Sequence, residues 1–341
     1  MYKICVFLML YCCFAYAVKD NVMTDDINRL MYDLNNQSQD RDLDEDNSIW
    51  PRVVKGFSLN HTETADVKYW QDRYSKPSFF YSVINNAAAY IYFVLIETER
   101  RGFPSELIFI PIIESAYNPK AQVAHGVSTG IWQFEQAAMV SYGMRNTKSL
   151  DERMDIIKST KSAMSYFQYL YNMFGNWETA IAAYNWGEGN VYNATVKAGG
   201  SKNFYDLSLR ETTKQYVAKL IAIASIIENP KRFGLQLPKI PNQPYLMIIQ
   251  PNDVYTEKEF INKLKISAKS FESFNPQFKD KNIVLDNNSS VLVPYYIAEK
   301  YYIEANGKVN KKTHNIDAIL QQIDIVNEDI KQNNKSKNNN L

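Results

Sequence analysis

The stretch Gly102–Pro119, GFPSELIFIPIIESAYNP, decides the fold of this chain and contains the residue that matters most for its chemistry. If the stretch is helical, Glu114 lies on the same face as Leu107, Ile110 and Pro111. A carboxyl group on an apolar face loses hydration, which disfavours its charged form and raises its pKa. Glu114 is therefore a candidate acid that stays protonated near neutral pH. A buried structural glutamate, paired with an arginine or capping a neighbouring helix, has the same local pattern.

The sequence around this stretch predicts a mainly α-helical domain over residues 49–238, with its core at about 100–230. Runs of alternating β-branched residues are scarce there. Apolar residues instead recur at helical spacing, for example at Tyr81, Ile84, Ala88, Ile91, Val94 and Leu95.

Beyond a group of prolines the composition changes, which indicates a small α/β module over residues 245–296. Tyr245–Ile249 and Val291–Pro294 read as strands, and Glu257–Ile266 reads as a helix between them. The tail, residues 297–341, is rich in Asn and Lys; we expect it to begin as a helix and to end disordered.

The N-terminus carries the pattern of an export signal. Lys3, an apolar run and the small residues around Tyr16 predict a signal peptide over residues 1–17, followed by a disordered acidic leader over residues 18–48. All cysteines lie in the predicted signal, so the exported protein has no thiol nucleophile. Lipidation at Cys12 or Cys13 is disfavoured because bulky residues precede them.

Charge and composition exclude several classes of function. Lys+Arg number 38 and Asp+Glu 37, so the chain has no basic field that would attract nucleic acid. The histidines number 3 and lack the spacing of a zinc site. We expect no metal and no cofactor.

Two further motifs place polar groups where they can meet a ligand. Gly130–Phe134 sets an aromatic ring and the amide of Gln133 after a glycine. Trp177, Ile181 and Tyr184 share a helical face, and glycines end that helix directly after Tyr184 and Asn185. Taken alone, Trp132 is better explained by core packing, and Tyr184 is explained equally well by packing.

In order, the motifs Glu114-Ser115, Gly130-Ile131-Trp132-Gln133 and Ala183-Tyr184-Asn185 resemble those of the transglycosylase SLT-domain family, which has a lysozyme-like fold. The resemblance extends upstream to Ile49–Phe57, and downstream to Tyr216–Leu220. It reaches the small module, which resembles the region before the LysM repeats of a lytic murein transglycosylase.

This resemblance implies a lytic transglycosylase that acts on peptidoglycan without water and has a single essential glutamic acid. Glu114 is then the general acid and base. The implied substrate-binding residues are Ser115, Gln133, Tyr184 and Asn185, and Glu211 and Tyr216 are implied as supporting residues around the acid. The expected partners are peptidoglycan glycan strands and other cell-wall enzymes, in the periplasm or at the outer membrane of a Gram-negative cell. Membrane association is expected to be peripheral or absent.

The sequence departs from the family pattern at two places. Val123 stands where the family usually has a serine, in a loop that is also longer, so Ser128 or Thr129 is a candidate substitute. The segment from Glu211 to Val217 carries an extra residue, and on a helix one residue rotates a side chain by about 100°. Glu211 therefore need not occupy the position of its family counterpart.

Two alternatives stay open. A hydrolytic muramidase of the goose-lysozyme type would need a second carboxylate near the site, for example Asp151, Glu178 or Glu188. A peptidoglycan-binding protein whose catalysis has decayed would have little reason to keep a desolvated acid at Glu114. The small module is either a degenerate LysM-like glycan binder or a brace for the helical domain.

Overall fold

The structure is a computed structural model that describes residues 47–123 and 126–306. Its contacts divide the chain into two compact units. The first runs to Gln243 and includes Pro276–Asp280, and the second comprises Pro244–Asn275 and the chain from Lys281 onward. The predicted signal peptide, almost all of the acidic leader and the end of the tail lie outside the described residues.

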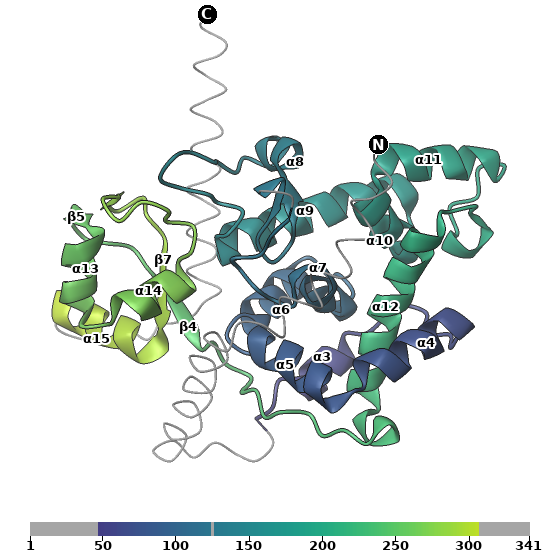
Figure 1. Cartoon of the computed structure of the whole chain (residues 1–341), viewed down its shortest axis with the longest axis horizontal. Helices are drawn as coiled ribbons and strands as arrows, with labels where there is room; N and C mark the ends of the chain where they lie inside the picture. The colour runs from purple at the N-terminus through teal and green to yellow at the C-terminus, as the bar shows by residue number, and fades with distance from the viewer. Residues whose placement is uncertain (1–46, 124–125, 307–341) are drawn as a thin grey trace, which may run out of the picture. The chain divides into compact units, whose positions relative to one another are not determined.

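The first unit is built mainly from helices, as the sequence predicts (Figure 1). In chain order its α-helices are α3 (Trp50–Lys55), α4 (Ala65–Tyr74), α5 (Pro77–Ala87), α6 (Ile91–Arg100), α7 (Ile110–Ser115), α8 (Gln136–Ser141), α9 (Ile156–Phe174), α10 (Trp177–Trp186), α11 (Glu188–Lys197) and α12 (Glu211–Glu228). Shorter 3-10 helices are η2 (Ser105–Phe109), η4 (Phe204–Asp206) and η5 (Pro230–Phe233).

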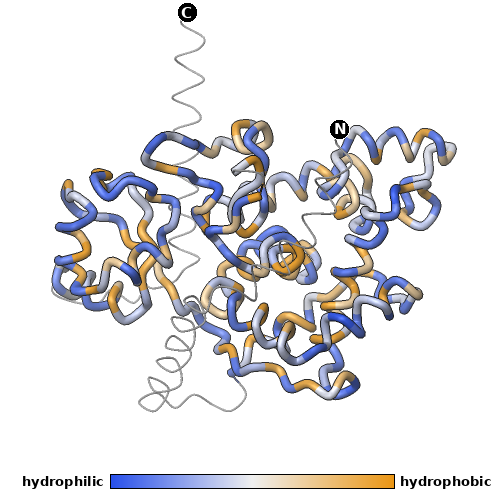
Figure 2. Tube along the Cα trace, in the orientation of Figure 1, coloured by the Kyte–Doolittle hydropathy of each residue, from blue (hydrophilic) through white to orange (hydrophobic). Residues whose placement is uncertain are grey.

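Helix α12 forms the central support of this unit. It packs against α4, α10, η2 and α7, and its residues are buried almost without interruption from Tyr216 to Ile227. Figure 2 shows α7 as a hydrophobic stretch next to it, and Ile110 and Ile112 of α7 are buried. Burying such side chains contributes about 1.5–3 kcal/mol each, so the packing of α7 on α12 fixes the position of Glu114.

The stretch before Glu114 is a 3-10 helix followed by an α-helix, rather than one continuous helix. Pro104 precedes η2, whereas Pro111 lies in the first turn of α7. The break has a local cause, because proline lacks an N–H and its ring clashes with the carbonyl four residues earlier. Helix α7 then ends at Ala116 and Tyr117, which both adopt left-handed backbone angles with φ of 52° and 59°.

A small antiparallel sheet, which the sequence analysis does not predict, interrupts the helices. Its strands β1 (Gln122–Val123), β2 (Ser128–Thr129) and β3 (Phe134–Glu135) are paired in chain order. The turn between β2 and β3 contains Gly130, whose φ is 82°. A Cβ added at Gly130 would lie 1.9 Å from the carbonyl oxygen of Arg153, so only glycine fits there.

Residues Pro276–Asp280 complete the first unit, although they come after Gln243 in the chain. Gln277 accepts a hydrogen bond from the backbone N–H of Asp151 at 2.9 Å, and Lys279 N–H donates to the carbonyl of Ser149 at 2.9 Å. These backbone pairs connect Pro276–Asp280 to the segment that precedes α9.

The second unit contains the secondary structure expected for the small module. Strands β4 (Leu246–Ile249) and β7 (Val291–Pro294) pair in antiparallel register, and a second short pair joins β5 (Tyr255–Thr256) to β6 (Val284–Leu285). The helices are α13 (Glu257–Leu264), α14 (Ala268–Phe274) and α15 (Tyr295–Asn306). The predicted strands and helix are confirmed, whereas glycan binding by this unit stays a prediction.

Within residues 47–123 and 126–306, no single helix is long and apolar enough to cross a bilayer; the bent pair α5 and α6 passes that test only when the two are taken together. Among the same residues, no group of three or more His, Cys, Asp or Glu side chains is placed to hold a metal ion.

Candidate active site

Glu114 lies at the end of α7, where the residue as a whole is half-buried and its carboxyl group faces Tyr216 of α12. Its Oε1 accepts a hydrogen bond from the hydroxyl of Tyr216 at 2.5 Å. Burial raises the pKa of Glu114 to about 7, against the hydrogen bond of Tyr216 and the charge of Lys219, which both lower it. The rise that the apolar face predicts is therefore present. A carboxyl group with this pKa can both donate and accept a proton near neutral pH.

Helix α12 supplies the groups that act on this carboxyl. Tyr216 is buried, and burial followed by the charge of Glu114 raises its pKa well above the ordinary value, so it remains a hydrogen-bond donor. Lys219 lies one turn later on the helix and is also buried, with its Nζ 4.5 Å from the ring centroid of Trp70. Tyr216, which the resemblance implies only as a supporting residue, contacts the acid directly. The sequence analysis missed Lys219 and Trp70.

Glu211 lies at the exposed start of α12 and connects to this cluster through another residue. Its Oε1 accepts from Gln215 Nε2 at 2.7 Å, and Gln215 Oε1 accepts from the indole N–H of Trp70 at 2.5 Å. Glu211 thereby helps to position Trp70. Its predicted role as a supporting residue for Glu114 stays a prediction.

Gln133 follows Gly130 in the turn before β3 and adopts a left-handed backbone with φ of 50°. Its Nε2 donates to the carbonyl of Gly130 at 2.7 Å and to that of Ala121 at 3.2 Å. Within the part of the chain that the structure describes, its Oε1 is buried and has no hydrogen-bond partner. A buried acceptor left unpaired costs about 1–3 kcal/mol, which a ligand donor would recover.

The end of α10 brings Tyr184 and Asn185 to the site. Tyr184 stacks on Phe167 with ring centroids 4.6 Å apart, and its hydroxyl donates to the carbonyl of Trp132 at 2.8 Å. The charge of Glu114 contributes, after burial, to raising the pKa of Tyr184, so the two side chains lie close together. Asn185 Oδ1 accepts from the hydroxyl of Thr213 at 2.9 Å, which ties α10 to the start of α12.

Ser115 and Trp132 have mainly internal contacts. The Ser115 hydroxyl is buried and lies 3.0 Å from the carbonyl of Ile131, to which it donates, so it links α7 to the turn that carries Gln133. Trp132 is buried and donates its indole N–H to Thr160, which leaves no ring face for a sugar. Of the two interpretations of Trp132, core packing is therefore correct. The prediction that Ser115 contacts substrate stays a prediction.

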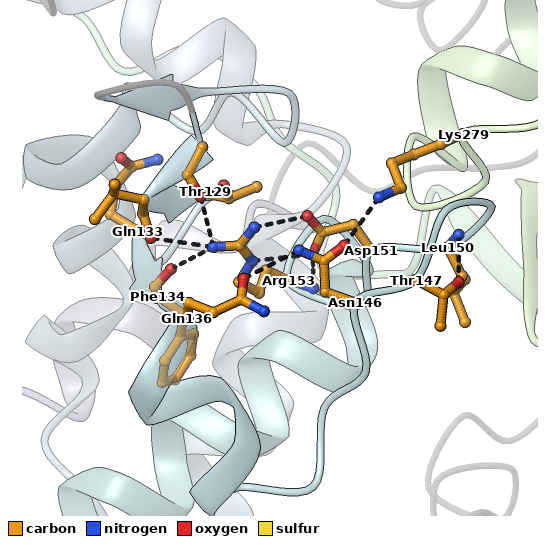
Figure 3. A network of polar contacts seen from close by, with 12 residues as sticks. Thr129, Gln133, Phe134, Gln136, Asn146, Thr147, Leu150, Asp151, Arg153 and Lys279 are labelled. Carbon is orange, nitrogen blue, oxygen red and sulfur yellow. Dashed lines mark hydrogen bonds and ion pairs between the residues drawn. The ribbon is translucent and has the colours of Figure 1, made fainter.

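A buried ion pair between Arg153 and Asp151 supports the turn from behind (Figure 3). Both side chains are almost fully buried, and they pair at 2.8 Å. The remaining guanidinium nitrogen of Arg153 donates to the carbonyls of Gly126, Val127 and Phe134. Arg153 thus fixes both sides of the turn that holds Gln133, a role that the sequence analysis missed.

The loop that departs from the family pattern pairs Val123 with Ser128 directly across β1 and β2. A hydroxyl therefore lies opposite the position where the family usually has a serine. Thr129, the other candidate substitute, is fully buried and donates to the carbonyl of Gly126 at 3.3 Å. Neither contact tests whether Ser128 or Thr129 forms a hydrogen bond to Glu114 or to substrate.

The carboxylates considered for a hydrolytic reaction each have a partner elsewhere. Asp151 is paired with Arg153, and Glu178 accepts from the backbone N–H of Asn60 at 3.1 Å. Glu188 accepts from the hydroxyl of Tyr166 at 2.7 Å. Each of these carboxylates therefore has a partner other than Glu114.

Comparison with known proteins supports the resemblance in the sequence. The sequence profile described as "Transglycosylase SLT domain" matches residues 92–206, a range that includes Glu114, Gln133 and Tyr184. The chain is 31% identical over 254 residues to "Membrane-bound lytic murein transglycosylase D" of Escherichia coli strain K12, covering 73% of this chain and 56% of that protein. The protein of the same name from E. coli O6:H1 matches to the same extent.

The match covers a larger share of another relative. "Putative tributyltin chloride resistance protein" of Alteromonas sp. strain M-1 is 33% identical over 166 residues, which are 48% of this chain and 78% of that protein. The chain spans only about half, 56%, of the lytic murein transglycosylases that it matches. From the ordered motifs, the helical fold and these matches together, we conclude that the chain belongs to the transglycosylase SLT-domain family.

Proposed function

We propose that this chain is a lytic transglycosylase. It cleaves the β-1,4 bond between N-acetylmuramic acid and N-acetylglucosamine in peptidoglycan and leaves a 1,6-anhydro-N-acetylmuramic acid end. The observation that carries the proposal is the carboxyl of Glu114, whose pKa is raised to about 7 and which accepts a hydrogen bond from Tyr216. The name of the E. coli relatives, lytic murein transglycosylase, supports the same reaction class.

In the first step Glu114 protonates the oxygen that joins the two sugars. The bond from this oxygen to C1 of N-acetylmuramic acid breaks, and positive charge develops on the sugar ring. Tyr216 and Lys219 both lower the Glu114 pKa, which means that they stabilise the glutamate formed in this step. Charge stabilisation of this kind, from donors already in place, is a large part of enzymatic rate enhancement.

In the second step the glutamate removes the proton from the C6 hydroxyl of the same sugar. The C6 oxygen then bonds to C1, which closes the 1,6-anhydro ring and returns Glu114 to its protonated form. No water is consumed, so the reaction needs no second carboxylate. In agreement with this proposal, Asp151 forms an ion pair with Arg153, and Glu188 accepts a hydrogen bond from Tyr166.

Gln133, Tyr184 and the turn around them hold the sugars. The unpaired Oε1 of Gln133 is an acceptor for a sugar hydroxyl or for the N–H of an acetamido group. Tyr184 lies near Glu114 and offers a half-buried ring. Ser115 and Asn185, also expected to bind substrate, contribute by holding α7 and α10 in place through their internal hydrogen bonds.

Peptidoglycan lies outside the cytoplasmic membrane, so this function requires export. The N-terminal sequence carries the pattern of a signal peptide, and a periplasmic or outer-membrane-associated location in a Gram-negative cell follows from the proposal. Other cell-wall enzymes remain expected partners.

The decisive experiment is digestion of purified peptidoglycan by the exported form of the protein and by Glu114→Gln, with mass analysis of the released fragments. We expect fragments lighter by one water than hydrolysed ones, and none from the variant, because glutamine cannot donate the proton. Loss of a general acid typically costs about 10²–10⁴-fold in rate. Reducing-end products that require Glu114 would instead identify a hydrolytic muramidase, and no release by either protein, in an assay where a known muramidase works, would favour a binding protein.

A further inference from the structure

Helix α4 packs along α12, the helix that supplies Tyr216 and Lys219 to the candidate active site (Figure 1). The buried residues of α4 recur at intervals of four and three, which is the spacing of one helical face; they are Val67, Gln71 and Tyr74. Both helices lie outside residues 92–206, the range that the SLT-domain profile matches. The candidate acid is therefore served by two helices from outside that range.

Trp70 of α4 contacts α12 at two points. Its indole N–H donates to Gln215 Oε1 at 2.5 Å, and Nζ of Lys219 lies 4.5 Å from the centroid of its ring. An ammonium group within about 6 Å of a ring centroid is attracted by the negative face of the ring. Lys219 is buried and Trp70 is half-buried, so water competes little with this attraction. Trp70 therefore restrains both side chains.

The ammonium group held at this ring acts on Glu114. Its charge lowers the Glu114 pKa together with the hydrogen bond from Tyr216, against the larger effect of burial. Tyr184 of α10 also lies near Glu114, because the charge of Glu114 contributes, after burial, to raising the Tyr184 pKa. Of these groups, Lys219 is the one that carries a positive charge, so its position affects how readily Glu114 ionises.

Other charged side chains surround Trp70. Arg73, on the same helix, has its guanidinium carbon 5.9 Å from the Trp70 ring centroid, so Lys219 is the nearer of these two cations. Glu211 accepts from Gln215 Nε2 at 2.7 Å and thereby holds the amide that accepts from the indole. The ring is thus fixed at its edge while its face remains with Lys219.

We propose that Trp70 is a positioning residue for the cleavage reaction: its ring holds the ammonium group of Lys219 beside Glu114, and its indole N–H anchors it to α12 through Gln215. The cation then stabilises the glutamate that forms when the glycosidic oxygen is protonated. Helix α4 supports the active site in this way, although it carries none of the motifs on which the resemblance to the family rests. This inference rests on the proposed function, because it names a support of the same acid.

The test compares Trp70→Leu with Trp70→Phe, which keeps a ring face for the ammonium group. The matched control is Trp177→Leu. Trp177 lies on α10, is likewise half-buried and packs against aromatic rings, with centroids 4.3 Å from Tyr171 and 4.9 Å from Phe103. Its replacement removes comparable aromatic packing from a different helix.

Two properties are measured in each protein. The pKa of Glu114 is followed without substrate by carbon NMR of protein labelled at the glutamate side-chain carboxyl groups, and its resonance is identified by its absence from Glu114→Gln. Cleavage of peptide-free glycan strands gives kcat, KM and the pH–rate profile.

We expect Trp70→Leu to raise the Glu114 pKa, and with it the alkaline limb of the pH–rate profile, by about 0.5–1. An opposite charge within about 4–6 Å lowers a carboxyl pKa by about 1–3, and a displaced Lys219 loses part of that effect. The kcat should fall about three- to tenfold with KM little changed, because Trp70 acts through Lys219 and not on the sugar.

The other variants show whether this effect passes through Lys219. Trp70→Phe should give a smaller rise of the same sign, which keeps the proposal testable if Trp70→Leu does not fold, and Trp177→Leu should keep the parent pKa of Glu114. In a Lys219→Met background, replacing Trp70 should no longer move that pKa. An unshifted pKa in the Trp70 variants, or an equal shift in Trp177→Leu or without Lys219, would overturn the proposal.

The two proposals fail in different ways, because the Glu114 pKa is measured without substrate. If the parent cleaves no glycan but Trp70→Leu still raises this pKa, the support of Lys219 by Trp70 stands and the catalytic function does not. If cleavage occurs and the pKa is the same in Trp70→Leu as in the parent, the catalytic function stands and the role of Trp70 does not.

Discussion

Glu114 and the turn that holds Gln133 are positioned in different ways. Glu114 is positioned by apolar packing of α7 on α12, and Tyr216 and Lys219, which act on its carboxyl group, both lie on α12. Gln133 is positioned by a left-handed backbone, a glycine that accepts no side chain and a buried arginine from another segment. The candidate acid, Glu114, therefore depends on the helical core, whereas Gln133, which we propose binds substrate, depends on long-range polar contacts.

The largest effect is expected from replacing Arg153, which supports the turn that holds Gln133. Arg153→Met removes one partner of a buried ion pair and leaves Asp151 uncompensated, which costs about 3–5 kcal/mol in the free energy of unfolding. Denaturant unfolding monitored by circular dichroism measures the loss. Removing the Asp151 charge in the same protein should recover part of it, because the unpaired charge is then absent.

Arg145→Met is the matched control for this change. Arg145 also pairs with an acid, Glu152, but its side chain is 66% exposed. Glu152 is buried, but Lys158 pairs with the same carboxylate at 2.7 Å, so the loss of Arg145 leaves no buried charge without a partner and should cost less stability than Arg153→Met. If the two variants lost equal stability, the turn would not depend on Arg153 in the way described.

A smaller effect tests the contact between Glu114 and α12. Tyr216→Phe removes a hydrogen bond to the carboxylate, and such bonds contribute about 1.5–3 kcal/mol, so we expect cleavage to slow by about ten- to a hundredfold. Because this bond lowers the Glu114 pKa, its loss raises that pKa further. The alkaline limb of the pH–rate profile should therefore move to higher pH.

Tyr301→Phe serves as the control for losing a buried tyrosine hydroxyl. Tyr301 lies in the second unit, where its hydroxyl bonds to Asn252 at 3.0 Å. This variant should keep the pH–rate profile of the parent. An unshifted profile in Tyr216→Phe, or a profile that moves to lower pH, would contradict the assigned role of Tyr216.

The last expected effect is on the pH dependence of stability. The folded-state pKa of Glu114 is about 7 and its ordinary value is 4.5, so the folded protein binds this proton more tightly than the unfolded chain does. The resulting stability is fully present below the ordinary pKa and is lost as pH rises through the folded pKa. Glu114→Gln has no such loss, so its melting temperature relative to the parent should increase between about pH 4.5 and pH 7. A constant difference across this window would mean that the site does not desolvate Glu114.

The parts of the site that lie on helices could be predicted from the sequence. Tyr184 and Asn185 are found at the end of α10, where the apolar spacing and the following glycines place them. The raised pKa of Glu114 also follows from its local neighbours, even though Pro111 divides the expected helix into η2 and α7.

The parts held by distant contacts could not be predicted. The short strands β1 to β3 have too few residues to show an alternating pattern, and nothing near Arg153 in the sequence indicates that it bonds to Gly126. Lys219 had a detectable signal, its spacing of one helical turn from Tyr216, but that spacing alone does not reveal a nearby acid. The local sequence indicates helical or strand periodicity only. The contacts of Arg153 and Lys219 join segments that are far apart in the sequence, so they depend on the whole fold.

The segment Pro276–Asp280 has a consequence for the modularity of the protein. A gene fragment that ended at Gln243 would encode all of α3 to α12, yet it would lack the carbonyl of Gln277, which accepts from the backbone of Asp151. Asp151, which forms the buried ion pair with Arg153, would then lose this backbone hydrogen bond. A boundary at Gln243 therefore does not enclose the whole helical unit, which is completed by residues that lie within the sequence of the following module.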